Sequence, residues 1–158
     1  MKKQFLLKTI FLFILSVSLF TACKKKDKNR PDGTSISYVV NGTSKAVTGE
    51  KNIYAVINKS NNTLTVTSKL TSTSENVTFV IPNFSGKAEY TIPANAHAQY
   101  TNGVVPASND YIATSGSVTI TEYENDKVSG SFHFYSMNSQ DAYKNITEGS
   151  FTAKVSQE

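Results

Sequence analysis

The amino-acid sequence predicts an all-β domain, an antiparallel β-sandwich or small barrel of about nine to ten short strands, behind a cleaved N-terminal leader. Three observations predict this fold. After Gly33, apolar residues alternate with polar ones at a period of two. Asn-Gly dipeptides and other polar turns separate these runs at short intervals. The same region shows no run of apolar residues at the spacing of a helix over three turns.

The first half of the domain contains several such rows, each followed by a turn. The rows are Ile36, Tyr38 and Val40; Ile53, Ala55 and Ile57; Leu64, Val66 and Leu70; and Val77, Phe79 and Ile81. Asn41-Gly42 is a strong hairpin signal, 58–62 is a polar turn, and Pro82 ends the fourth row. Weaker strands are expected over 88–92 and 97–101, before the turn Asn102-Gly103.

The C-terminal third has the clearest alternation. Val118 and Ile120 precede a turn over 124–127, and an inner row then follows: Val128, Gly130, Phe132 and Phe134. Phe151, Ala153 and Val155 form the last predicted strand, whereas 137–147 is expected to be a loop. Gly130 and Gly149 each precede aromatic residues, which predicts a bulge or a close approach between backbones. The phenylalanines are expected in the core.

Composition and charge limit the classes of protein that fit. The chain has 158 residues, 39% of them hydrophobic and 18% charged, which suits one compact domain. Its net charge of +4 comes from the first 32 residues, because from Gly33 onward eight lysines face ten acidic residues. A domain that binds nucleic acid needs a basic face, so no nucleic-acid partner is expected.

The N-terminus has the three-part pattern of a signal peptide. Lys2 and Lys3 open the chain, about a dozen apolar residues follow, and small residues precede Cys23. The apolar run is shorter than the ~20 residues of a spanning helix, which disfavours an uncleaved anchor. A single cysteine in an exported protein cannot form an internal disulfide, so its thiol needs another role.

The segment Leu19-Phe20-Thr21-Ala22-Cys23 resembles the lipobox of bacterial lipoproteins, although Phe20 departs from the usual Leu, Val or Ile. The resemblance implies that Cys23 becomes the first residue of the mature chain and carries fatty acyl chains such as palmitate. The predicted division is therefore a signal peptide over 1–22, a lipidated basic tether over 23–34 and a β domain over 35–158. The tether is expected to be a solvated spacer rather than a headgroup-binding segment.

The C-terminal sequences Gly116-Ser-Val-Thr-Ile-Thr, Val128-Ser-Gly-Ser-Phe-His-Phe and Ile146-Thr-Glu-Gly-Ser-Phe resemble those of a family of small Bacteroidota lipoproteins. That family is catalogued as a domain of unknown function. The resemblance covers roughly residues 36–156. It implies an all-β lipoprotein domain and no established activity, so it supplies no catalytic residues.

Residues with chemical potential are few and scattered. His97 and His133 are isolated and expected at the surface, and the sequence lacks the ligand spacing of a zinc site. Glu122 and Glu124 share one strand face, but a glycosidase pair normally flanks a cleft from separate elements. We therefore expect no catalytic residues, no metal and no cofactor.

The expected function is that of a non-enzymatic envelope lipoprotein whose β domain binds a protein or glycan partner or supports an envelope assembly. A lipocalin-like carrier of a small apolar ligand is the first alternative, and a hydrolase using surface carboxylates is the second. Tyr100 and Tyr111 flank a long polar loop and are the expected surface contacts. The expected location is the outer membrane, facing the periplasm, because Lys24-Lys25-Lys26 differs from the acidic pattern of surface-exported lipoproteins.

Overall fold

The computed structural model describes residues 33–70, 73–103 and 109–158, all within the unit Pro31–Glu158. These residues form ten strands: β1 (Ser35–Val40), β2 (Thr43–Thr48), β3 (Ile53–Asn58), β4 (Thr63–Leu70), β5 (Glu75–Ile81), β6 (Glu89–Ile92), β7 (His97–Thr101), β8 (Asp110–Glu124), β9 (Lys127–Met137) and β10 (Tyr143–Gln157). The described part of the chain has no helix long and apolar enough to cross a membrane. The predicted all-β fold is confirmed.

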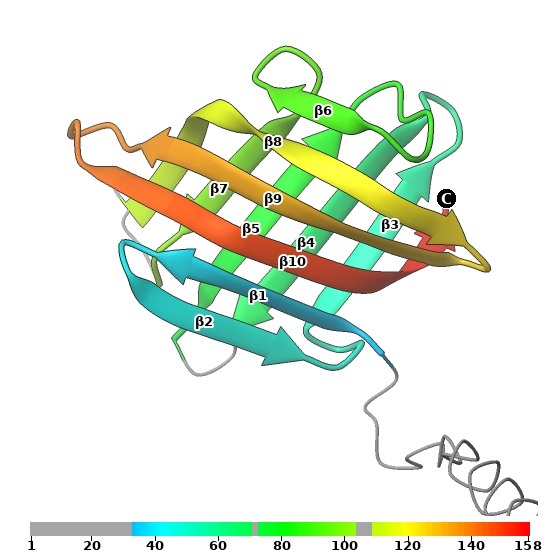
Figure 1. Cartoon of the computed structure of the whole chain (residues 1–158), viewed down its shortest axis with the longest axis horizontal. Helices are drawn as coiled ribbons and strands as arrows, with labels where there is room; N and C mark the ends of the chain where they lie inside the picture. The colour runs from blue at the N-terminus through cyan, green and yellow to red at the C-terminus, as the bar shows by residue number, and fades with distance from the viewer. Residues whose placement is uncertain (1–32, 71–72, 104–108) are drawn as a thin grey trace, which may run out of the picture. The chain divides into compact units, whose positions relative to one another are not determined.

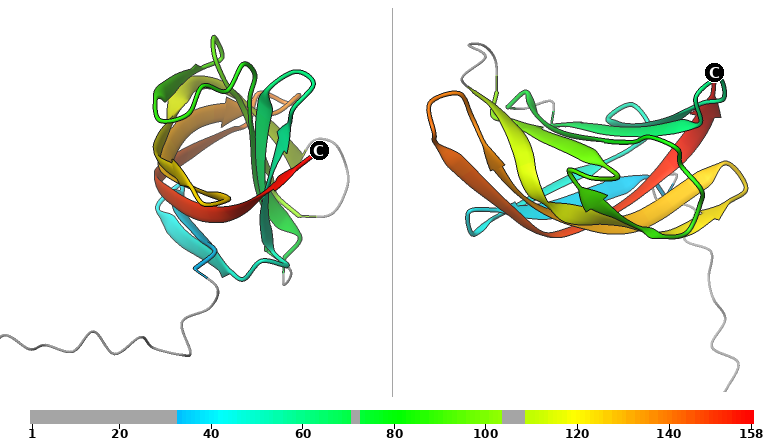
Figure 2. Two further views of the ribbon diagram at one scale, coloured as in Figure 1. Left: turned by 90° about the vertical axis from the view of Figure 1, so that its right-hand side faces the viewer. Right: turned by 90° about the horizontal axis from the view of Figure 1, so that it is seen from above.

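Seven of the strands close into a barrel, one of the two architectures that the sequence left open. Around the barrel the order is β10-β3-β4-β5-β7-β8-β9, and β9 pairs with β10 to complete the ring. Neighbouring strands are antiparallel except for β10 and β3, where Val155–Gln157 run parallel to Ala55–Ile57. In Figure 1, β8, β9 and β10 cross in front of β3, β4, β5 and β7. Figure 2 shows the strands curving around a common interior.

Two long strands change partners along their length, which attaches the remaining strands to the barrel. One edge of β10 pairs first with β1 and then with β3, and β1 in turn pairs with β2. One edge of β8 pairs first with β7 and then with β6. The β1–β2 hairpin and β6 therefore extend the front layer beyond the ring, as Figure 1 shows.

The predicted inner rows form the core. Four phenylalanines from three strands occupy its centre, each at most 3% exposed: Phe79, Phe132, Phe134 and Phe151. The Phe79 ring centroid lies 4.9 Å from that of Phe151 and 5.6 Å from that of Phe132. Most alternate residues on the same strands are polar and less buried, as expected for a sheet with one wet side.

The turns follow the chemistry that the sequence indicates. In the β1–β2 turn, Asn41 and Gly42 both have positive φ, at 46° and 83°. Two such residues define the turn that matches the twist of a two-residue hairpin. Asn125 and Asp126 connect β8 to β9 in the same way, with φ of 53° and 56°.

Two predicted boundaries are wrong. β8 begins at Asp110, eight residues before the first predicted position of that strand, and β10 begins at Tyr143, inside the expected loop over 137–147. The alternation fails in both places because the pairing register shifts, between Ala113 and Ser115 and between Ile146 and Gly149. A bulge inserts an extra residue and reverses the inward and outward assignment after it.

Candidate functional site

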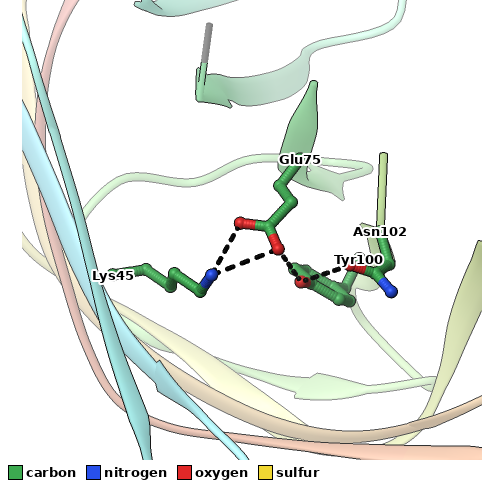
Figure 3. A network of polar contacts seen from close by, with 4 residues as sticks. All are labelled: Lys45, Glu75, Tyr100 and Asn102. Atoms are coloured by element: carbon green, nitrogen blue, oxygen red, sulfur yellow. Dashed lines mark hydrogen bonds and ion pairs between the residues drawn. The ribbon is translucent and has the colours of Figure 1, made fainter. Parts of the chain in front are cut away.

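A cluster of polar side chains lies inside one end of the barrel (Figure 3). It contains Glu75 from the first position of β5, Lys45 from β2, Tyr100 from β7 and Asn102 just after β7. Glu75 occupies the same inward-facing row as Val77 and is 7% exposed. Strand alternation therefore forces this carboxylate into the interior.

Glu75 is held from two sides. The Lys45 Nζ donates a hydrogen bond to Glu75 Oε1 at 3.2 Å and lies 3.0 Å from Oε2. The Tyr100 hydroxyl donates to Oε1 at 3.1 Å and also lies 3.5 Å from Asn102 Oδ1. A buried carboxylate is tolerated when it is paired and hydrogen-bonded, as here.

The cluster keeps its protonation state fixed around neutral pH. Burial alone would raise the pKa of Glu75, but hydrogen bonds from Lys45, Tyr100 and Thr73 and the lysine charge outweigh it, so the pKa is lowered. Burial and the Glu75 charge raise the pKa of Tyr38 to about 12 and also raise that of Tyr100. Glu75 is thus ionised and both tyrosines are protonated at pH 7. General acid–base chemistry needs a group that titrates near the working pH, and these three do not.

Tyr38 completes the aromatic side of the cluster. Its ring centroid lies 6.5 Å from that of Tyr100 and 6.1 Å from that of Phe132, and its buried hydroxyl has no hydrogen-bond partner among the described residues. The cluster therefore joins the charged pair directly to the phenylalanine core. The Lys45–Glu75 ion pair holds β2, which lies outside the ring, against β5, which is part of the ring.

Tyr100 and Tyr111, the predicted surface contacts, are both buried. They are 1% and 7% exposed, and their ring centroids lie 6.1 Å apart. The two residues are paired across β7 and β8, where both point inward. The surface prediction for these side chains is therefore wrong: strand alternation, rather than the polar loop between them, determines their orientation.

The other candidate residues lie where the sequence places them but do not converge. His97 and His133 are exposed. Glu124 pairs with Lys87, Oε1 to Nζ at 2.9 Å, whereas Glu122 accepts a hydrogen bond from Ser129 at 3.3 Å. Within the described ranges, no group of three or more His, Cys, Asp or Glu side chains could hold a metal ion. Cys23 lies outside the described residues.

A second feature, on the outer face at the same end of the barrel, was not predicted. Four large apolar side chains from β8, β9 and β10 are exposed there, and we call them the tyrosine patch: Ile112 (54%), Tyr135 (40%), Met137 (38%) and Tyr143 (58%). Met137 pairs with Ile112 on one side and with Tyr143 on the other. The rings of Tyr135 and Tyr143 are stacked, with centroids 5.5 Å apart and 22° between their planes.

The inner faces of the same strands support the patch. Lys144, next to Tyr143, places its Nζ 5.4 Å from the ring centroid of Tyr111. Asn138 begins the connection between β9 and β10, and its Oδ1 accepts hydrogen bonds from the backbone of Gln140 and Ala142. The hairpin that carries Met137 and Tyr143 is therefore fixed by its own polar contacts.

Several open hollows lie among the described residues, and three of them have linings that do not include the phenylalanine core. One, of about 340 Å³, lies among Pro82, Tyr90 and neighbours near β6. A second, of about 280 Å³, lies beside Gly33 and the β8–β9 turn. A third, of about 270 Å³, lies between the β1–β2 hairpin and Glu148 of β10. All three are open to solvent, and Tyr38 and Lys45 of the polar cluster line the third.

The sequence contained a signal for the buried cluster that the predictions did not use. Glu75 lies two residues before Val77, and Lys45 two residues before Val47, so each is a charged residue in line with an inward row. A charge at such a position is expected to find a partner of opposite sign. The tyrosine patch was missed because Ile112 and Tyr143 precede the expected starts of their strands.

The fold and these two features define a small closed β-barrel domain with an interior filled by aromatic rings and a structural ion pair at one end. The chain belongs to the family described as Domain of unknown function (DUF6252), whose profile matches residues 39–154. This result confirms the membership in a family of unknown function that the C-terminal resemblance implied. No curated protein and no solved structure matches the chain.

Proposed function

We propose that this protein is a non-enzymatic lipoprotein of the cell envelope, anchored through acyl chains on Cys23. Its β domain binds a protein or glycan partner, or supports an envelope assembly, at the periplasmic side of the outer membrane. Kinship with small Bacteroidota lipoproteins and the location at the outer membrane are both part of this proposal. Two separate lines of reasoning support it, one for the anchor and one for the binding role.

The anchor rests on the order of residues at the N-terminus. Lys2 and Lys3, a short apolar run and small residues lead directly to Cys23. One acyl chain holds a protein only marginally, whereas two or three hold it firmly, at ~0.8 kcal/mol per buried methylene. A lipidated cysteine also gives a role to a thiol that has no disulfide partner in the chain.

The packing of the barrel interior is the observation that supports the proposed binding role. Phe132 has ring centroids of three other phenylalanines within 6.3 Å, and all four rings are almost fully buried. Side chains therefore occupy the space in which a lipocalin-like carrier would hold its ligand. This observation favours recognition on the outer surface over transport of an apolar molecule inside the barrel.

The hydrolase reading receives less support. It would require Glu122 or Glu124 to meet another polar group in a concave pocket. The contacts of these two carboxylates, with Ser129 and Lys87, are those of ordinary exposed side chains.

Fractionation of cells that express the full chain tests the anchor. Wild type is expected in the membrane fraction, with a mass that corresponds to a chain starting at an acylated Cys23. Cys23→Ser should leave the protein unprocessed or released, while Ser16→Ala, a matched change within the leader, should behave as wild type. A Cys23→Ser protein with the membrane fractionation and mass of wild type would contradict the proposal. Protease treatment of intact cells then tests the leaflet, since a periplasm-facing domain is protected.

A further inference from the structure

We propose that the hollow of about 340 Å³ beside β6, here called the β6 hollow, is a binding subsite for one ring of a neutral saccharide. This inference rests on the proposed function and deepens it, because it commits recognition by the domain to a glycan and names the residues that contact it. Three features of the hollow carry the inference: its polar side chains, its volume and the hydrogen bonds that fix its walls.

Three polar side chains line the β6 hollow, those of Asn83, Glu89 and Asn95. All three residues are exposed, and among the described residues none of these side chains forms a hydrogen bond or an ion pair. A carboxamide offers both donors and an acceptor, and a carboxylate accepts only. Because each hydroxyl of a sugar ring both donates and accepts, this set of groups can bind several neighbouring hydroxyls at once.

The remaining lining favours a neutral sugar over other small ligands. Pro82, Ala88 and Ala94 present small apolar surfaces that can contact the C–H groups of a ring. The described lining contains no lysine or arginine, while Glu89 adds a negative charge, so a phosphate or an acidic sugar is disfavoured. A peptide bound as an added strand would need a longer free edge than the four residues of β6.

The volume of the β6 hollow suits a single ring. Sites for small molecules occupy about 300–1,000 Å³, and the hollow lies at the lower end of that range. It is open to solvent, so further rings of a longer chain can continue outside it. The hollow therefore fits one unit of a glycan better than a large compact ligand.

Hydrogen bonds fix the walls of the β6 hollow before a ligand binds. The Tyr90 hydroxyl accepts from the backbone N–H of Ser85 at 3.0 Å and donates to the carbonyl oxygen of Gly86 at 2.9 Å. The backbone N–H of Phe84 donates to the carbonyl oxygen of Asn62 at 2.7 Å, which ties this loop to the β3–β4 turn. A preformed site avoids much of the entropy that ordering a loop on binding would cost.

An NMR titration of the full lipidated chain tests the proposal. The protein carries ¹⁵N-asparagine and is kept in a phosphocholine detergent, which has no sugar headgroup. The probes are the methyl pyranosides of glucose, galactose, mannose and N-acetylglucosamine. At least one should shift the side-chain amide signals of Asn83 and Asn95 saturably, with a Kd of about 1–10 mM, as expected for so small a ligand. The signal of Asn76, on the outer face of β5, should not move.

Variants then locate the contact. Asn83→Gly and Asn95→Ala should each raise the Kd about two- to tenfold, the loss expected for one hydrogen bond. Glycine is the substitution at position 83 because Asn83 has a φ of 51°, which alanine adopts only with strain. Asn76→Ala is the matched control and should leave the Kd unchanged. Since the ligand is neutral, the Kd should also change little between about 0.1 and 0.5 M salt. Thermal unfolding confirms that each variant is folded.

The proposal would be overturned if none of the four pyranosides gave saturable shifts, or if the shifts left Asn83 and Asn95 unmoved. Equal shifts from glycerol at the same concentration, a Kd that rises steeply with salt, or an equal effect of Asn76→Ala and Asn95→Ala would also contradict it. These results are distinct from failure of the proposed function. A Cys23→Ser protein that fractionates as wild type refutes the anchor, whereas an anchored protein without these sugar shifts refutes the subsite.

Discussion

At the level of single residues, three glycines determine how closely the strands of the front layer approach. Each is paired directly with a phenylalanine on the next strand: Gly116 with Phe134, Gly130 with Phe151 and Gly149 with Phe132. A Cβ on Gly130 would lie 2.2 Å from the carbonyl oxygen of Thr119 and 2.8 Å from the ring of Phe151. The aromatic ring thus occupies the space that a side chain would take.

Gly130→Ala is therefore expected to destabilise the domain. The added methyl group must displace backbone as well as a ring, and overpacking of this kind costs about 1–3 kcal/mol. Chemical denaturation should show a lower midpoint with the same slope. Gly42→Asn is the control, because Gly42 has open space around it and asparagine tolerates its positive φ. A stability equal to wild type for Gly130→Ala would contradict the close approach.

Residue-scale prediction from the sequence worked where alternation was unbroken. Phe132, Phe134 and Phe151 were predicted to be buried, and Gly130 and Gly149 to allow close approach, and all five predictions are confirmed. The surface prediction for Tyr100 and Tyr111 failed because it was drawn from the loop between them. Their strand positions, each in register with the other, determine burial.

At the level of strands, the Lys45–Glu75 pair connects two elements that share no backbone pairing. β2 is hydrogen-bonded to β1, while β5 lies in the other layer between β4 and β7. The ion pair crosses from one to the other, and Tyr100 holds the carboxylate from β7. The β1–β2 hairpin is thereby held against the end of the barrel.

Glu75→Gln should lower the free energy of unfolding at pH 7 by about 1–3 kcal/mol, since it leaves the half-buried Lys45 without its counter-charge. The pKa of Glu75 is lower in the folded state than its ordinary 4.5. The stabilisation that ionised Glu75 contributes is therefore fully present above about pH 4.5. It is lost as the pH falls through the lower pKa of Glu75 in the folded state. The difference between wild type and variant should shrink over that acidic range.

The exposed pair Lys87–Glu124 supplies the control for this measurement. Its side chains are 51% and 61% exposed, and exposed pairs contribute little because water screens them. Glu124→Gln should leave the unfolding curve close to that of wild type at pH 7. If both glutamine variants followed the pH profile of wild type, Glu75 would not provide the connection between the layers.

Strand boundaries were harder to predict than strand faces, and the bulges explain why. In β8 the pairing shifts between Ala113 and Ser115 and again between Ile120 and Glu122, and in β10 between Ile146 and Glu148-Gly149. A strict period of two is lost at each shift. The N-terminal halves of both strands therefore do not show the alternation that predicts a strand. The tyrosine patch lies on those two halves and on the end of β9, and was missed for that reason.

At the level of the whole molecule, closure and filling of the barrel are linked. Seven strands leave a narrow interior, and small barrels of this size fill it with side chains. Here the rings of three strands fill it, while the charged pair lies at one end beside Tyr100, against which Tyr38 packs. This filling supports the proposal of recognition on the outer surface over that of a carrier.

A neutral naphthylamine dye that fluoresces in apolar surroundings tests this view directly. The native protein should give no saturable signal, because Phe79, Phe132, Phe134 and Phe151 already contact one another. Phe132→Ala should remove a central ring, cost about 3–5 kcal/mol and leave a cavity that small apolar molecules such as benzene enter. Benzene should then raise the Tm of Phe132→Ala but leave wild type and the surface variant Tyr54→Ala unchanged. Saturable dye binding by the native protein, displaced by a fatty acid, would instead establish a carrier and contradict the filled interior.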